Sequence, residues 1–155
     1  MDILLFILIV AGMFAFMEFV AWFAHKFIMH GFLWTLHRDH HRKEPGFFEK
    51  NDAFFLIFAS PAIVLFYIGA TSSQWWLVAA AVGITLYGSA YFLVHDVFIH
   101  QRFKWFRKAD SEYLRAIRRA HYAHHSHLDK EDGESFGMLL APRRFFRTMR
   151  KTAKN

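Results

Sequence analysis

Residues 53–94 contain no Asp, Glu, Lys or Arg, although 21% of the 155 residues in the chain are charged. A surface helix of a soluble protein needs a polar face for water, and this stretch offers none. A buried pair of core helices in a soluble protein is therefore a poor explanation for it. We predict that these residues cross a membrane, within a chain whose length is typical of one domain.

The N-terminal residues 3–24 form another apolar run, which Glu18 alone interrupts. At about 1.5 Å per residue, a helix of this length covers roughly 33 Å, enough to cross the hydrocarbon core of a bilayer. A cleaved signal peptide would begin with basic residues and end at small ones. This chain begins Met1-Asp2 and continues directly into Trp22, Phe23 and His25, so we interpret the run as a membrane span.

The uncharged stretch divides into two further spans, residues 53–70 and 75–94. Pro61 predicts a kink in the first of them, and the second can continue as a helix to about Ile99. Only residues 71–74 lie between the two spans, so they must form an antiparallel hairpin.

The basic residues predict the orientation in the membrane. All 19 Lys and Arg lie in residues 24–52 or 100–155, and none lies in the N-terminus or the 71–74 turn. Basic loops stay in the cytoplasm. We therefore expect the N-terminus outside, and residues 25–52 and 95–155 inside.

The C-terminal third should be soluble or interfacial. Residues 110–125 have helical spacing, with Ser111 or Asp110 as the N-cap. Residues 142–154 mix Phe and Met with six basic residues, which predicts a helix on an anionic membrane surface. Binding to nucleic acid is the alternative for this tail, and the membrane spans argue against it.

The chain has 11 histidines and no cysteine. The missing cysteine excludes disulfides, thiolate zinc sites, cysteine-ligated iron–sulfur clusters and a cysteine nucleophile. Ten histidines form four groups, in which an H-x4-H spacing and then an H-x2-H-H spacing occur twice: His25 and His30, His37, His40 and His41, His95 and His100, and His121, His124 and His125. Each group follows a predicted span or the helix after it, so all should meet at the cytoplasmic membrane face.

Helical geometry limits what each spacing can do. H-x2-H-H places three imidazoles within about 100° on one helix face. Residues five apart lie about 140° apart, so an H-x4-H pair reaches one centre only where the helix distorts or ends. Gly31, directly after His30, is a natural helix stop. The spacing does not tell which histidine binds which metal.

Ten imidazoles offer only nitrogen ligands, which suit iron, zinc, copper or nickel. One structural zinc needs four ligands, whereas two metals with five histidines each would keep a position open for oxygen. Soluble di-iron bundles use Glu-x-x-His pairs, and this chain contains none. The pattern predicts a histidine-rich di-metal centre, with His127 outside it, either solvated or behind the ligands.

These motifs resemble those of the bacterial-type β-carotene 3-hydroxylases, in the membrane fatty-acid hydroxylase/sterol desaturase superfamily. The similarity covers nearly the whole chain and is densest in residues 17–41 (MEFVAWFAHKFIMHGFLWTLHRDHH), 46–52 (GFFEKND), 91–102 (YFLVHDVFIHQR) and 135–142 (SFGMLLAP).

The resemblance implies one all-α integral membrane hydroxylase domain over residues 1–155, in the bacterial inner membrane. About three transmembrane helices, with cytoplasmic and interfacial helices, would enclose a di-iron (Fe²⁺) centre. That centre would use O2 to hydroxylate β-ionone rings at C3, converting β-carotene through β-cryptoxanthin to zeaxanthin. Electrons would come from NAD(P)H through ferredoxin reductase and a ferredoxin. The implied metal ligands are His25, His30, His37, His40, His41, His95, His100, His121, His124 and His125.

Other residues near the histidines have two interpretations each. A substrate pocket or mere membrane anchoring would explain Phe19, Trp22, Phe23, Tyr91 and Phe92. Asp96 could orient a ligand ring or pair with Arg102. Glu18 could lie behind the metal site or join two helices. Asn51 and Asp52 are expected to cap the second span.

The basic cytoplasmic face either follows from topology alone or docks an acidic electron carrier. Three alternatives to the carotenoid function stay open. One is the same chemistry on a fatty acyl chain, a sterol or another carotenoid. The others are a non-enzymatic membrane metal or haem protein and a metal transporter. Haem ligation would favour histidines within the spans, and a transporter would need polar groups at the bilayer midplane.

Overall fold

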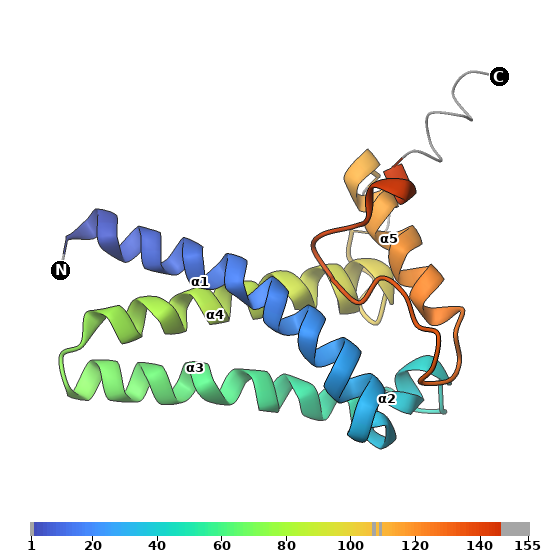
Figure 1. Ribbon diagram of the computed structural model, residues 1–155, viewed down its shortest axis with the longest axis horizontal. Helices are drawn as coiled ribbons and strands as arrows, with labels where there is room; N and C mark the ends of the chain where they lie inside the picture. Colours follow the sequence, from blue (N-terminus) through green and yellow to red (C-terminus); the bar gives the residue numbers. More distant parts are fainter. Residues whose placement is uncertain (1, 107, 109, 147–155) are drawn as a thin grey trace.

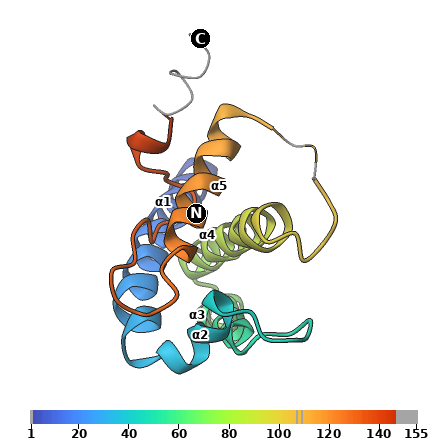
Figure 2. The same cartoon turned by 90° about the vertical axis from the view of Figure 1, so that its right-hand side faces the viewer.

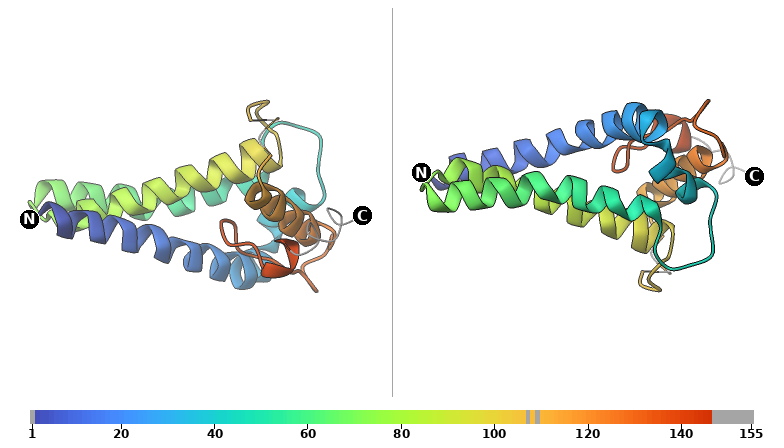
Figure 3. Two further views of the ribbon diagram at one scale, coloured as in Figure 1. Left: turned by 90° about the horizontal axis from the view of Figure 1, so that it is seen from above. Right: turned by 90° about the horizontal axis from the view of Figure 1, so that it is seen from below.

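The computed structural model describes residues 2–106, 108 and 110–146, and this part of the chain is helical or irregular throughout. Three long helices run side by side: α1 (Ile3–Phe23), α3 (Ala53–Thr71) and α4 (Trp75–Phe92) (Figures 1 and 3). At the start of α1 the Asp2 carboxylate accepts the Leu4 N–H (3.0 Å), which satisfies one free helix-end donor.

Three helices are long and apolar enough to cross a membrane: Ile3–Phe32, Lys50–Thr71 and Trp75–Ile99. Each predicted span is thus a helix of sufficient length and apolar composition, and the third extends to Ile99 as expected. The helix α3 continues through Pro61 as one element. The N-terminus and the turn between α3 and α4 lie at the same end of the bundle (Figure 1).

The helix α4 lies between α1 and α3 and packs against both. Glycines permit the close approach on each side. A Cβ on Gly83 would lie 2.7 Å from Met13 of α1, and a Cβ on Gly69 of α3 would lie 2.8 Å from Val78 of α4. Small residues at helix contacts are typical of membrane bundles, because lipid offers no hydrophobic drive for larger side chains to associate.

The opposite end of the bundle holds the shorter elements. The π-helix η1 (Ala24–Phe32) extends α1 and leads into α2 (Trp34–His41). The 3-10 turn η2 (Lys50–Asp52) precedes α3, and a second π-helix, η3 (Leu93–Ile99), extends α4. The helix α5 (Glu112–His125) lies across this end (Figure 2).

Ser111 is the N-cap of α5, where its hydroxyl accepts the Leu114 N–H (3.1 Å), as one of the two predicted caps. After α5 the chain forms an irregular segment, residues 126–142, which we call the C-terminal loop. It returns across the histidine-bearing end toward α1 (Figure 1). Of the predicted interfacial helix over 142–154, residues 143–146 are helical and residues 147–154 lie outside the described residues.

Candidate metal centre

The two H-x4-H pairs lie on the two π-helices. A π-helix bonds residue i to residue i+5 and so brings these two positions onto one face. The ring centroids of His25 and His30 are 5.3 Å apart in η1, and those of His95 and His100 are 4.5 Å apart at η3. Gly31 interrupts η1 with non-helical backbone angles (φ −102°, ψ −123°) directly after His30. The helix distortion that the spacing required is present at both pairs.

Five histidines form the first histidine group. Their candidate ligand nitrogens all lie within 4.8 Å of one another, and every ring is buried. The elements η1, α2 and α5 supply them, and its members are His25, His30, His37, His41 and His124.

The second histidine group has four members with ligand nitrogens within 4.8 Å of one another: His40, His95, His100 and His121. His125 is not a member of this cluster, and its ring centroid lies 4.5 Å from that of His41 in the first group. We assign it to the second group because its centroid lies 4.5–4.9 Å from those of three members there, His40, His100 and His121. Its Nε2 atom is buried without a hydrogen-bond partner among the described residues, as expected for a lone pair that awaits a cation. The ten histidines therefore divide into two sets of five.

The Nδ1 atoms identify the tautomer of seven of these rings. Each donates its hydrogen to an oxygen that only accepts, at 2.7–3.1 Å. The acceptors in the first group are the backbone carbonyls of Phe136, Lys130, His127 and Glu134, and the Asn51 side-chain oxygen. In the second group they are the carboxylates of Glu49 and Asp96.

A neutral imidazole that donates through Nδ1 presents a bare lone pair at Nε2. These lone pairs face one another: Nε2 of His25 lies 3.1 Å from Nε2 of His37, and Nε2 of His40 lies 2.9 Å from Nε2 of His95. Two acceptors at this distance repel each other unless a cation lies between them. The side chains present therefore fit bound metal ions, one in each group.

Burial favours the neutral form of four of these imidazoles. It lowers the pKa of His41 to about 4, of His124 to about 3 and of His37 to about 2. In the second group, burial lowers the pKa of His100 to about 2. Ligand nitrogens must be deprotonated to bind a metal, so they are ready to bind at neutral pH.

The C-terminal loop closes over the first group. Its Phe136 ring packs edge-on against His25, His30 and His124, with centroids 5.1–5.4 Å away. Glu18 of α1 anchors the far end of the loop by accepting three successive backbone N–H groups, those of Met138, Leu139 and Leu140, at 3.0–3.1 Å.

A sequence model of the family described as fatty acid hydroxylase matches residues 10–148. The chain belongs to the fatty acid hydroxylase family. The match includes every histidine of both groups, so the family assignment and the site geometry concern the same part of the chain.

Named relatives of this family member cover most of its length. The β-carotene hydroxylase of Pantoea ananas is 43% identical over 126 residues, which are 81% of this chain and 71% of that relative. A β-carotene hydroxylase from a Paracoccus species is 38% identical over 140 residues, 88% of this chain and 84% of the relative. The chloroplastic β-carotene 3-hydroxylase 2 of Arabidopsis thaliana is 41% identical over 132 residues, which are 82% of this chain and 42% of that relative. No solved structure matches the chain.

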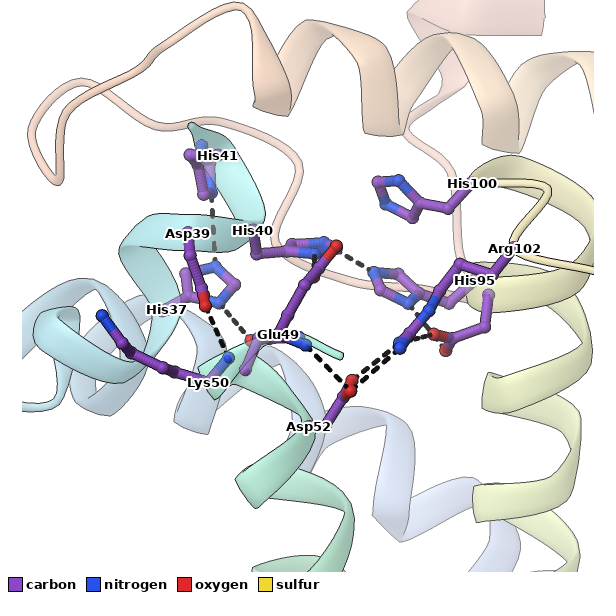
Figure 4. Close-up of polar contacts among 12 residues, drawn as sticks. His37, Asp39, His40, His41, Glu49, Lys50, Asp52, His95, His100 and Arg102 are labelled. Atoms are coloured by element: carbon purple, nitrogen blue, oxygen red, sulfur yellow. Dashed lines mark hydrogen bonds and ion pairs between the residues drawn. The ribbon is translucent and has the colours of Figure 1, made fainter. Parts of the chain in front are cut away.

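In this fatty acid hydroxylase family member Asp96 contacts both a histidine ring and Arg102. Its Oδ2 accepts the Nδ1 hydrogen of His95 (3.0 Å), and its Oδ1 accepts from the Arg102 guanidinium (2.9 Å) (Figure 4). Arg102 also pairs with Asp52 at 2.6 and 2.9 Å. These bonds raise the pKa of Arg102, with Asp52 as the main cause.

Three residues near the ligands have roles that the sequence did not indicate. Asn51 was expected to cap the second span, but its side-chain oxygen instead accepts from His37 Nδ1 (2.7 Å). Asp52 stands at the N-cap position of α3 without a side-chain capping bond to it, and instead accepts the Glu49 N–H (3.1 Å) in a capping box at η2. Glu49 accepts from His40 Nδ1 (2.9 Å), and burial raises the pKa of its carboxyl. In the sequence, the stretch GFFEKND was the one indication that these three residues matter, and helix capping was the simpler explanation for it.

The aromatic residues considered for a pocket lie in two places. On α1, Phe19 and Phe23 are exposed and stack with each other and, through Phe19, with Trp22. On α4, Tyr91 packs against His95 with ring centroids 5.1 Å apart. Phe92 contacts Phe103 beyond the end of η3. Among these residues, Tyr91 is the one that touches a histidine of the second group.

Proposed function

We propose that this chain is a β-carotene 3-hydroxylase that forms one membrane hydroxylase domain over residues 1–155. One observation carries the proposal: curated β-carotene hydroxylases are 38–43% identical to it over at least 81% of its length. The two five-histidine groups at the end of an apolar bundle support it, because they offer metal sites beside the space that a bilayer-dissolved substrate occupies.

In this proposal the first histidine group holds one iron ion and the second group holds the other. Imidazole nitrogen suits iron and zinc alike, but zinc has no redox chemistry. Bound iron would supply the activation of O2 that no side chain can supply for attack on an aliphatic C–H bond. For each ring, O2, two electrons and two protons give one C–OH group and one water.

The protein itself contributes three things. Carbonyl, amide and carboxylate oxygens at Nδ1 orient the rings and keep Nε2 free for the metal. The buried positions of His37 and His124, 1% and 0% exposed, exclude water from the first group. The bundle end that carries Tyr91 presents an apolar wall, against which we place the β-ionone ring, with Phe92 and the α1 aromatics Phe19, Trp22 and Phe23 on the path from the lipid.

We further propose that the histidine-bearing end faces the cytoplasm and receives electrons from a ferredoxin-type donor. The exposed basic side chains at this end, which include Lys43, Lys104 and Arg119, support docking of an acidic partner. Turnover with reduced ferredoxin should slow as salt rises, and indifference to ionic strength would remove the docking idea. Reporter fusions at the 71–74 turn and at residue 146 would test the orientation.

The function is tested by expression in bacterial cells that accumulate β-carotene, followed by chromatography of the pigments. We expect β-cryptoxanthin and then zeaxanthin to appear. Unchanged β-carotene beside well-expressed, iron-loaded protein would contradict the proposal. Analysis of hydroxylated fatty acids and sterols in the same cells tests the alternative lipids, and the His124→Ala variant is the inactive control.

A further inference from the structure

The two histidine groups differ in what lies behind their rings. In the first group every Nδ1 hydrogen goes to a formally neutral oxygen, of a backbone carbonyl or of the Asn51 amide. In the second group the two Nδ1 hydrogens with oxygen acceptors go to side-chain carboxylates, Glu49 for His40 and Asp96 for His95. The histidine spacings are the same in both repeats, so the spacings themselves do not predict this difference.

The two carboxylates lie in sheltered positions. The Glu49 and Asp96 side chains are each 16% exposed, and the His40 and His95 side chains are 4% and 5% exposed. Solvent screens such pairs weakly, so the charge of each carboxylate acts on the ring beside it.

A network holds both carboxylates in place (Figure 4). Arg102 bridges Asp96 and Asp52, and Asp52 accepts the backbone N–H of Glu49. Arg102 bonds to two carboxylates, Asp52 and Asp96, and the Glu49 carboxylate adds a third negative charge beside His40. The surroundings of the second group are therefore net negative, whereas the direct acceptors of the first group carry no formal charge.

A carboxylate that accepts the Nδ1 hydrogen draws that proton toward itself and makes Nε2 a stronger electron donor. Nearby negative charge also stabilises a cation directly. Both effects act on the second group. We propose that the two metal sites are unequal, and that the second histidine group binds its divalent cation more tightly because Glu49 and Asp96 stand behind His40 and His95.

This inference rests on the proposed function only in taking the two histidine groups as metal sites, and it does not depend on the substrate. It is tested on the purified full chain in detergent with ferrous iron under anaerobic conditions. One equivalent of ⁵⁷Fe is added first and one equivalent of natural iron second. We expect the Mössbauer spectrum of the ⁵⁷Fe to be dominated by one quadrupole doublet, because the tighter site fills first.

The variants Glu49→Gln and Asp96→Asn remove the charge but keep an oxygen acceptor for Nδ1. In a chelator competition, each variant should lower the affinity for one of the two metal ions roughly 10–100-fold and leave the affinity for the other unchanged. Each should also spread the ⁵⁷Fe over two doublets. The reverse variant, Asn51→Asp, puts a carboxylate behind His37 and should tighten the weaker site.

Glu134→Gln is the matched control, because Glu134 orients His124 through its backbone carbonyl and not through its side chain. It should change neither affinity. Two equal metal affinities in the unaltered protein would overturn the inference. An equal loss of affinity for both metal ions in Glu49→Gln would overturn it as well. If the metals prove unequal while β-carotene remains unconverted in cells, the inference stands and the proposed function fails.

Discussion

Tyr87 of α4 donates its hydroxyl hydrogen to the carboxylate of Glu18 in α1 at 2.7 Å, and both side chains are buried. Every further hydrogen bond that Glu18 accepts comes from the C-terminal loop, at Met138, Leu139 and Leu140. One intramembrane acid thus joins two transmembrane helices to the segment that orients the first histidine group. Because all its partners are donors, the carboxylate is held as an acceptor on both oxygens.

We expect Glu18→Gln to loosen the C-terminal loop. The neutral amide would replace a charged acceptor of four donors, and the weaker hydrogen bonds should cost about 1–3 kcal/mol. Tyr87→Phe removes a single hydrogen bond to a charged group and should destabilise by about 1.5–3 kcal/mol. Thermal unfolding in detergent measures both. Ser89→Ala is the control, since the Ser89 hydroxyl donates to the Thr85 carbonyl of its own helix. Equal stability of Glu18→Gln and the control would contradict this role.

The division into two groups predicts single-metal variants. His124→Ala should lower the metal content from two ions per chain to one, by loss from the first group, and His121→Ala should do the same in the second group. Both should abolish hydroxylation. His127→Ala is the control, because His127 contributes its backbone carbonyl to His41. Metal analysis of the purified variants decides, and loss of both ions from either variant would speak against independent sites.

Arg102→Lys should destabilise the protein although it keeps the charge. The guanidinium bonds to Asp52 through two nitrogens, to Asp96 through one and to the Phe47 carbonyl, and a single ammonium cannot reproduce this fork. Loss of two charge-assisted bonds should cost about 2–4 kcal/mol, discounted for the partial exposure of Asp52. Arg42→Lys, at an exposed pair with Asp129, is the control and should shift unfolding much less.

The buried histidines predict that acid destabilises the metal-free protein. The folded-state pKa values of His41 and His124, about 4 and about 3, lie below the unfolded value of about 6.5. Below about pH 6.5 the unfolded chain therefore binds protons that the folded chain does not. The contribution of these histidines to the free energy of unfolding should be fully present above about pH 7. It should decrease toward pH 4, by about 1.4 kcal/mol per pH unit for each such histidine.

Unfolding of the chelator-treated protein at pH 7.5 and pH 5 measures this loss. His41→Gln should flatten the pH dependence by removing one of the titrating groups. Equal stability at the two pH values would show that the histidines are not buried as neutral rings.

The sequence alone predicted the parts that depend on local pattern. An uncharged stretch of 42 residues has no solvated face in any fold, so the hairpin of α3 and α4 could be predicted from residues 53–94. The count and repeat of the histidines predicted two metals with five ligands each. The 140° separation within H-x4-H required a helix distortion, and the π-helices η1 and η3 supply it.

Only the tertiary structure decided how the ten histidines divide. His40 and His41 are neighbours in the chain, yet they belong to different groups, because adjacent residues point about 100° apart on α2. Apart from Asp96, the partners behind the rings were also beyond sequence reasoning. The Phe136 carbonyl accepts from His25, 111 positions away in the sequence. Glu49 and Asn51 lie in one short turn, yet Glu49 accepts from the second group and Asn51 from the first. Local pattern specifies which side chains can bind a metal, whereas long-range packing decides which oxygen, neutral or charged, stands behind each one.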